Sequence, residues 1–235
     1  MHWVRDRTGR FRWRPYYQPA DIDALCEDRI ERFLRARYGV VEYPILTDDL
    51  TRLIEQEASD LDLYADLSGH AGAGMNAEGV TTFYWHRRPM VQIAQALSLD
   101  ARREPRLRTT LAHELGHVLL HDFAHHDAGD DVPPMDESDA DWPAVCSPAV
   151  ATPGQADWME WQAGYASGAL LMPRTAVQQA IFPSTERHDA SSLMAGGLGR
   201  AIDIVQGHFM VSDAAALMRL RQLGYAPARG HDRDE

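Results

Sequence analysis

The sequence has few cysteines and no long apolar run. Its 235 residues include only two cysteines, Cys26 and Cys146, which are far apart and form no CxxC pair. This spacing argues against both a disulfide framework and a cysteine-based zinc site. A run of about 18 apolar residues, which a membrane helix needs, is absent, and Met1–Arg10 contains no apolar stretch. We therefore expect no membrane span, no signal peptide and a cytoplasmic location.

The sequence also lacks an excess of positive charge. It has 23 Lys and Arg against 35 Asp and Glu, which gives a formal net charge of −12. Because bulk binding to nucleic acid requires a basic surface, we do not expect it of this chain. The exception is the arm at residues 1–18, where Arg5, Arg7, Arg10, Arg12 and Arg14 interleave with aromatic residues. Such an arm either stacks on bases or packs its aromatics on the domain, and we favour packing.

The most informative stretch is Leu111–His121, LAHELGHVLLH. It contains His113-Glu114-Leu115-Gly116-His117, an HExxH motif. Residues four apart lie on one face of a helix, about 6 Å apart along its axis, so both imidazoles can bind one zinc ion. Glu114 is placed to reach a metal-bound water and to act as general base.

The residues around this motif predict a helix. An apolar stripe is formed by Leu107, Leu111, Leu115 and Val118, and Pro105 suits a first helical turn. The alternative is an amphipathic helix whose histidines merely face outward. We favour the metal site, because the downstream sequence also fits it.

The third ligand is not supplied by His121. His121 lies two helical turns, about 12 Å, from His113, so both cannot bind one ion on a straight helix. A motif that uses a late histidine breaks the helix with glycine, and Leu119 occupies that position here. We therefore predict a supporting or structural role for His121. A glutamate facing the motif from a second helix would complete the site, and the candidate stretch is Asp157–Ala166.

The two motifs together resemble the ImmA/IrrE family of zinc metallo-endopeptidases, an HExxH group of the gluzincin-like kind. In that family HExxH is followed by a helix of the form E-x-x-A-N-x-F-A-x-x-L-L-M-P. Glu160, Gln162, Ala163 and Leu170-Leu171-Met172-Pro173 match this form. Gly164 stands where the family has Asn or Asp, which removes a polar group near the metal, and Ala166 replaces Phe.

The resemblance implies that zinc is held by His113, His117 and Glu160, with Glu114 as general base. It implies an endopeptidase that cleaves one regulatory protein, such as a helix-turn-helix repressor of stress or mobile-element genes. Tyr165 is the only candidate we name for stabilising the oxyanion. The alternative function is a non-proteolytic regulator that binds a transcription factor or DNA and has a structural or inert metal site.

We expect an α+β fold that is mainly helical, with a small sheet beside the metal helix and a C-terminal helix-turn-helix-like subdomain. The predicted domains are the arm at 1–18, a peptidase domain at 19–182, and a C-terminal subdomain with its tail at 183–235. In that subdomain Arg219 and Arg221 are balanced by acidic residues, which favours packing or protein docking over DNA binding.

Two segments near the metal helix carry further expectations. Residues 79–94 predict a hairpin with a turn near Arg87-Arg88-Pro89, in which Met90–Ile93 is the edge that takes a substrate strand. His86, beside the turn, is more simply an exposed residue than a site residue. Residues 122–156 are an irregular acidic insertion, for which we favour a surface loop. The alternative is a lid over the metal, in which Cys146 or an acidic side chain is an inhibitory ligand.

Overall fold

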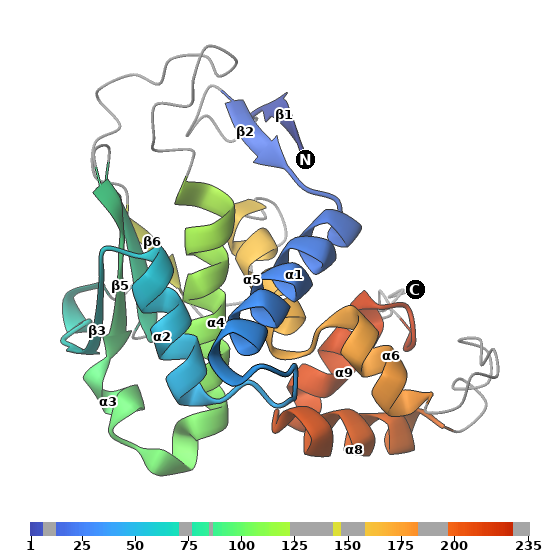
Figure 1. Ribbon diagram of the computed structural model, residues 1–235. Helices are drawn as coiled ribbons and strands as arrows, with labels where there is room; N and C mark the ends of the chain where they lie inside the picture. Colours follow the sequence, from blue (N-terminus) through green and yellow to red (C-terminus); the bar gives the residue numbers. More distant parts are fainter. Residues whose placement is uncertain are drawn as a thin grey trace, which may run out of the picture. The chain divides into compact units, whose positions relative to one another are not determined.

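The structure is a computed structural model that describes residues 1–6, 13–70, 77–84, 87–122, 143–146, 158–182 and 197–227, of which 143–146 by backbone alone. It is α+β and mainly helical with a small sheet, which confirms the predicted class (Figure 1). The elements are β1 (His2–Arg5), β2 (Trp13–Tyr16), α1 (Pro19–Tyr38), α2 (Thr47–Glu57), β3 (Asp60–Ala65), β4 (Gly79–Tyr84), β5 (Arg87–Ala94), α3 (Gln95–Ser98), α4 (Glu104–His121), β6 (Pro143–Cys146), α5 (Trp158–Leu171), α6 (Arg174–Ile181), α8 (Leu198–Phe209) and α9 (Asp213–Gln222). Two 3-10 turns lie at Ser68–His70 and Ala101–Arg103. Among these described residues, no helix combines the length and apolar character needed to cross a bilayer.

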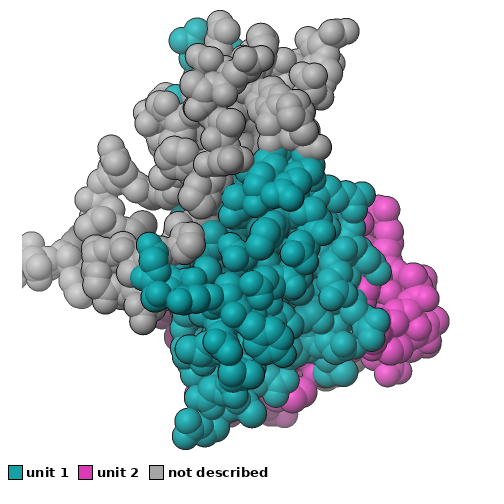
Figure 2. All heavy atoms as spheres, turned by 90° about the vertical axis from the view of Figure 1, so that its left-hand side faces the viewer, with its two compact units in different colours: residues 1–24, 46–167 teal, residues 25–45, 168–235 magenta. Residues whose placement is uncertain are grey.

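The chain divides into two compact units, which Figure 2 distinguishes by colour. The sheet unit comprises residues 1–24 and 46–167, and the helical unit comprises residues 25–45 and 168–235. Two of the three boundaries fall inside α1 and α5, and the third falls just before α2, so each unit consists of two separate segments. The domains predicted at 1–18, 19–182 and 183–235 are continuous, and they stay a prediction.

The sheet of the sheet unit has the strand order β3-β5-β4-β6. β3 runs parallel to β5, and β4 runs antiparallel to both β5 and β6. α4 contacts β4, β5 and β6, and α2 contacts α4 and β3 (Figure 1). The metal helix therefore lies against the sheet, as the sequence predicted.

The hairpin is present, but its assignment as a substrate edge is wrong. β5 lies between β3 and β4, so Met90–Ile93 is central. Val91 and Ile93 are fully buried, and the segment Asp60–Ala65 pairs with the side of β5 that we expected to be free. Arg87 and the two residues after it begin β5 instead of forming the turn. His86 lies outside the described residues.

Local signals explain the ends of several helices. Gly39, with φ 77°, follows α1 directly and adopts the left-handed backbone that glycine tolerates. α9 begins after Ser212, whose hydroxyl accepts a hydrogen bond from Ala215 N–H at 3.2 Å. α2 begins after Leu46, which takes the cap position, and the Asp49 carboxylate accepts the Leu46 N–H at 3.2 Å.

The helical unit contains the pair α8 and α9. Arg219 of α9 is fully buried, and its Nε donates to the Met172 carbonyl at 2.9 Å. Its guanidinium also reaches the Gln222 side-chain oxygen at 3.3 Å. This arginine is therefore a core residue and does not belong to an exposed recognition surface.

Candidate metal centre

Both histidines of the motif project from the same side of α4. The Nε2 atoms of His113 and His117 lie 3.1 Å apart, as their one-turn spacing predicted. The apolar stripe holds the helix in place, since Leu111 and Leu115 are fully buried. Pro105 lies in the first turn, where its missing N–H costs no helical hydrogen bond.

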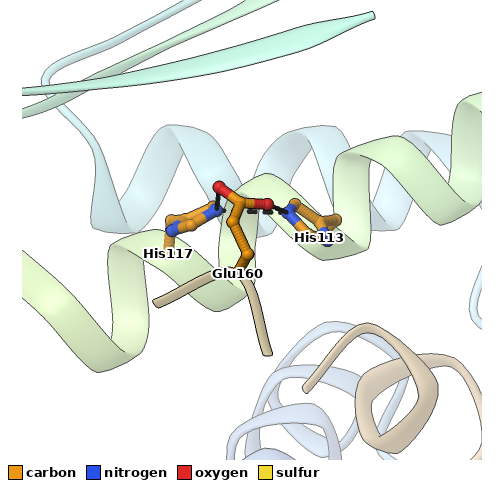
Figure 3. A group of neighbouring side chains, drawn as sticks. All are labelled: His113, His117 and Glu160. Carbon is orange, nitrogen blue, oxygen red and sulfur yellow. Dashed lines mark hydrogen bonds and ion pairs between the residues drawn. The ribbon is translucent and has the colours of Figure 1, made fainter. Parts of the chain in front are cut away.

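Glu160, in the first turn of α5, completes the group. Its Oε2 lies 3.2 Å from His113 Nε2, and its Oε1 lies 3.4 Å from His117 Nε2. Figure 3 shows the carboxylate lying between the two imidazole rings. Burial by itself raises the pKa of Glu160, but hydrogen bonds and charge from the two histidines outweigh it and hold that pKa well below its usual value.

Small side chains let α5 approach α4 closely. A Cβ placed on Gly116 would lie 3.0 Å from Ala166 Cβ and 3.1 Å from the Ala163 carbonyl oxygen. Ala166 is fully buried at this contact. The alanine that departs from the family pattern therefore fits an interface without room for a larger side chain, and this close approach carries Glu160 to the histidines.

The motif glutamate, Glu114, is fully buried and points toward β4. Its Oε2 accepts a hydrogen bond from the Thr81 hydroxyl at 2.6 Å. Within the described residues its Oε1 has no hydrogen-bond partner, and a Cβ on Gly79 would lie 2.5 Å from that atom. Burial raises the pKa of Glu114, against opposing charge from His117 and His113 and the Thr81 hydrogen bond. One carboxylate oxygen is thus fixed while the other is left without a partner.

Sequence reasoning missed Thr81 and Gly79. They are two residues apart on a strand, so their side-chain positions share one face of the sheet. That alternation was visible in the sequence. Which face of the hairpin would meet Glu114 was not.

A chain of hydrogen bonds runs from His117 away from the metal position. His117 Nδ1 lies 3.1 Å from His121 Nδ1, and His121 Nε2 lies 3.0 Å from Gln162 Oε1. Gln162 Nε2 donates to the Pro15 carbonyl in β2 at 3.3 Å. Because a carbonyl only accepts, the Gln162 amide orientation is fixed, and its Oε1 must accept from His121 Nε2. His121 Nδ1 then carries a lone pair and accepts from His117 Nδ1.

Together with the protonation state of His117, this series of hydrogen bonds determines whether Nε2 presents a proton or a lone pair to Glu160. A neutral His117 that donates from Nδ1 has its lone pair on Nε2. In that neutral form the lone pair faces the Glu160 carboxylate, and a cation bound between them would satisfy both acceptors. With a second proton on His117, Nε2–H instead donates to Glu160, and this is one of the hydrogen bonds that lower the pKa of Glu160. Two imidazoles and a carboxylate, with ligand atoms all within 4.8 Å of one another, form a group that could hold a metal ion.

The remaining sequence candidates lie elsewhere. The Tyr165 hydroxyl donates to Asp23 Oδ2 at 3.1 Å in a buried contact, so it does not face the metal group. A Cβ on Gly164 would meet nothing within 4 Å, and the polar group near the histidines is supplied by Gln162 instead. His121 has the supporting position that we predicted. The side chain of Cys146 lies outside the described residues, so its role as a metal ligand stays a prediction.

No model of a known protein family matches the chain, and no curated protein sequence matches it. The resemblance to ImmA/IrrE peptidases therefore depends on the two motifs.

Proposed function

We propose that this protein is a zinc-dependent endopeptidase with Glu114 as its general base. The observation that carries the proposal is the position of Glu114. It is the residue next to His113, it is completely buried, and within the part of the chain that the structure describes its Oε1 has no hydrogen-bond partner. The adjacent residue His113 belongs to the group of two histidines and a glutamate that could hold a metal ion. A site that only holds a metal for structure has no need of such a carboxylate.

The donor set favours zinc over other ions. Two histidines and one glutamate are a ligand set of catalytic zinc sites, which keep a fourth position open. At metal–ligand distances of 2.0–2.1 Å, a tetrahedral arrangement separates neighbouring ligand atoms by roughly 3.3 Å. The two histidine Nε2 atoms lie 3.1 Å apart, and each lies close to a different oxygen of Glu160, His113 at 3.2 Å from Oε2 and His117 at 3.4 Å from Oε1. With one ligand atom taken from each residue, all separations stay within 4.8 Å. Calcium and magnesium prefer sites made of oxygen ligands alone.

The residues divide the chemistry as follows. His113, His117 and Glu160 would hold the zinc ion, which would make a bound water more acidic and would polarise the scissile carbonyl. Glu114 takes the proton of that water on Oε1 and delivers it to the leaving amine. Thr81 keeps the other oxygen occupied, so the base presents a single orientation. Burial raises the pKa of Glu114, which brings its basicity closer to neutral pH and favours proton transfer.

The proposed substrate is one regulatory protein, a helix-turn-helix repressor. This follows from the motif resemblance, and the charge of the chain is compatible with it. A net charge of −12 attracts the basic surface of a DNA-binding protein at a rate that salt reduces. Core placement of Arg219 leaves α9 better suited to contact protein than DNA.

The test uses purified, zinc-loaded protein incubated with candidate helix-turn-helix repressors and with casein. We expect one cut in a cognate repressor and almost no degradation of casein, measured by intact-mass spectrometry. Rapid casein degradation with every repressor intact would disprove the narrow specificity. No cleavage of any protein by a chain that contains stoichiometric zinc would disprove the peptidase function and favour a regulator with an inert site.

A further inference from the structure

The edge of the sheet beside Glu114 is occupied by the chain itself. β6 pairs antiparallel with β4, and the partners are Gly79 with Cys146, Val80 with Val145, Thr81 with Ala144 and Thr82 with Pro143. α4 contacts both of these strands. β6 belongs to the acidic insertion. Its backbone therefore runs beside β4, the strand whose Thr81 donates a hydrogen bond to Glu114.

Backbone N–H and C=O groups of successive β4 residues point alternately toward β5 and toward β6, so each residue can be assigned to one of these two strands. The Ala94 N–H donates to the Glu78 carbonyl at 2.9 Å, which places the backbone groups of Glu78 toward β5. Backbone groups of successive residues in an antiparallel strand face opposite sides. Those of Gly79 and Thr81 therefore face β6.

The sequence of β6 agrees with this assignment. Gly79 and Thr81 lie opposite Cys146 and Ala144, whose N–H groups are available to them. Pro143 has no N–H, and it lies opposite Thr82, whose backbone faces β5. The proline thus falls at a position where β4 requires no donor from it.

Gly79 and Thr81 of β4 lie beside Glu114 and also direct their backbone hydrogen-bonding groups toward β6. Thr81 donates its side-chain hydroxyl to Glu114, and Gly79 makes room for the Glu114 carboxylate. An extended peptide bound to their backbone groups lies about 4.8 Å from β4, beside the general base. In the proposed mechanism a scissile peptide bond is presented beside Glu114, which makes this edge the candidate position for a substrate strand.

We propose that β6 is an internal substrate mimic, which occupies the edge of β4 that a protein substrate must use as an added strand. The proposal depends on the peptidase function. A tethered strand acts at an effective concentration in the millimolar range, so a weakly bound extended chain cannot displace it. A partner that also docks elsewhere on the protein can. Specificity then comes from displacement of β6 more than from recognition of the cleavage site.

The test compares two proline substitutions in adjacent residues of β6. Cys146→Pro removes an N–H that faces Gly79, whereas Val145→Pro removes one that faces away from β4. We expect Cys146→Pro to raise casein cleavage by roughly tenfold and Val145→Pro to leave it unchanged. Cys146→Ser, which keeps the N–H but loses the thiol, controls for metal binding by the side chain. If Cys146→Ser activates as strongly as Cys146→Pro, backbone occupancy is not the cause and the proposal fails.

A second measurement does not require peptidase activity. In a Glu114→Gln background, hydrogen exchange of the Gly79 and Thr81 amides should be about tenfold faster in Cys146→Pro than in Val145→Pro. Equal exchange rates in the two variants would overturn the proposal, whether or not the protein cleaves anything. Faster exchange without any gain in casein cleavage, in a protein that cuts its repressor, would overturn it as well. Loss of the peptidase function itself is detected separately, as absence of cleavage by the wild type.

Discussion

Each unit contains a completely buried charged side chain, and the two differ in their hydrogen bonding. The difference distinguishes a side chain that we propose for catalysis from one that stabilises the core. Glu114 in the sheet unit and Arg219 in the helical unit are both completely buried. Arg219 donates to the Met172 carbonyl and to the Gln222 side chain, as a buried polar group in a core does. Glu114 has one oxygen held by Thr81 and, within the described residues, one with no partner. A buried polar atom without a hydrogen-bond partner lowers the free energy of unfolding. Its presence at Glu114 therefore favours a catalytic role over a structural one.

The comparison predicts opposite outcomes when each group is replaced. Glu114→Gln should reduce cleavage by on the order of 100-fold or more, because the general base is lost. Zinc content should stay at the wild-type level, because Glu114 is not a ligand. Cleavage at the wild-type rate, followed by intact-mass spectrometry, would rule out the proposed mechanism.

Stability of the same variant gives a further test with a defined sign. Burial raises the pKa of Glu114 above its ordinary value of 4.5, so the folded protein loses stability as pH rises through that raised pKa. Glutamine does not titrate. The metal-free Glu114→Gln variant should therefore gain stability over the metal-free wild type as pH is raised from about 4 to 8, measured by urea denaturation. A gain that is constant over this range would contradict the pKa shift.

Metal binding should depend on Glu160 far more than on His121. Glu160→Ala removes a ligand and should lose most of the bound zinc. His121→Ala keeps all three ligands but frees His117 Nδ1, so zinc affinity should fall by roughly 10- to 100-fold while stoichiometric binding at high zinc persists. Competition with a chromophoric chelator measures both. Equal affinity in the wild type and the Glu160 variant would remove Glu160 from the site.

Arg219→Met should have the reverse profile of Glu114→Gln. It leaves the Met172 carbonyl and the Gln222 side chain without their arginine partner, which should lower the free energy of unfolding by about 2 kcal/mol. Zinc content and cleavage rate should be unchanged, because the arginine partners described above, Met172 and Gln222, are not metal ligands. A loss of zinc in this variant would show that the helical unit supports the site.

A residue of the site could be predicted from the sequence when its partners lie within a few positions of it, and not when they lie far away in the chain. His113, Glu114 and His117 follow from one helical turn, and a short-range pattern is enough to find them. Glu160 lies 43 positions beyond His117 and was found only through the family resemblance. The chain from Gln162 to Pro15 joins residues 147 positions apart, and no sequence pattern indicates it.

The sheet shows the same limit. The hairpin of β4 and β5 was predicted from composition and turn residues, which are local. The position of β5 at the centre was not, because it depends on pairing with Asp60–Ala65, more than twenty residues upstream. Pairing of β6 with β4 is a contact of still longer range. Strand order depends on such distant pairings, so a correct fold class can accompany a wrong assignment of the substrate edge.

The smallest effect that we expect comes from removing the single hydrogen bond between Thr81 and Glu114. Thr81→Val keeps the shape of the side chain and removes the hydroxyl that Glu114 Oε2 accepts. The loss of one such bond is worth about 0.5–1.5 kcal/mol, so kcat/KM should fall by roughly 2- to 10-fold at neutral pH. Because the Thr81 hydroxyl lowers the pKa of Glu114, its removal raises that pKa further, and the acid limb of the pH profile should move to higher pH. Thr81→Ser restores a donor and should restore both the rate and the acid limb. If Thr81→Val lowers the rate equally at every pH, Thr81 only packs against Glu114 and does not orient the base.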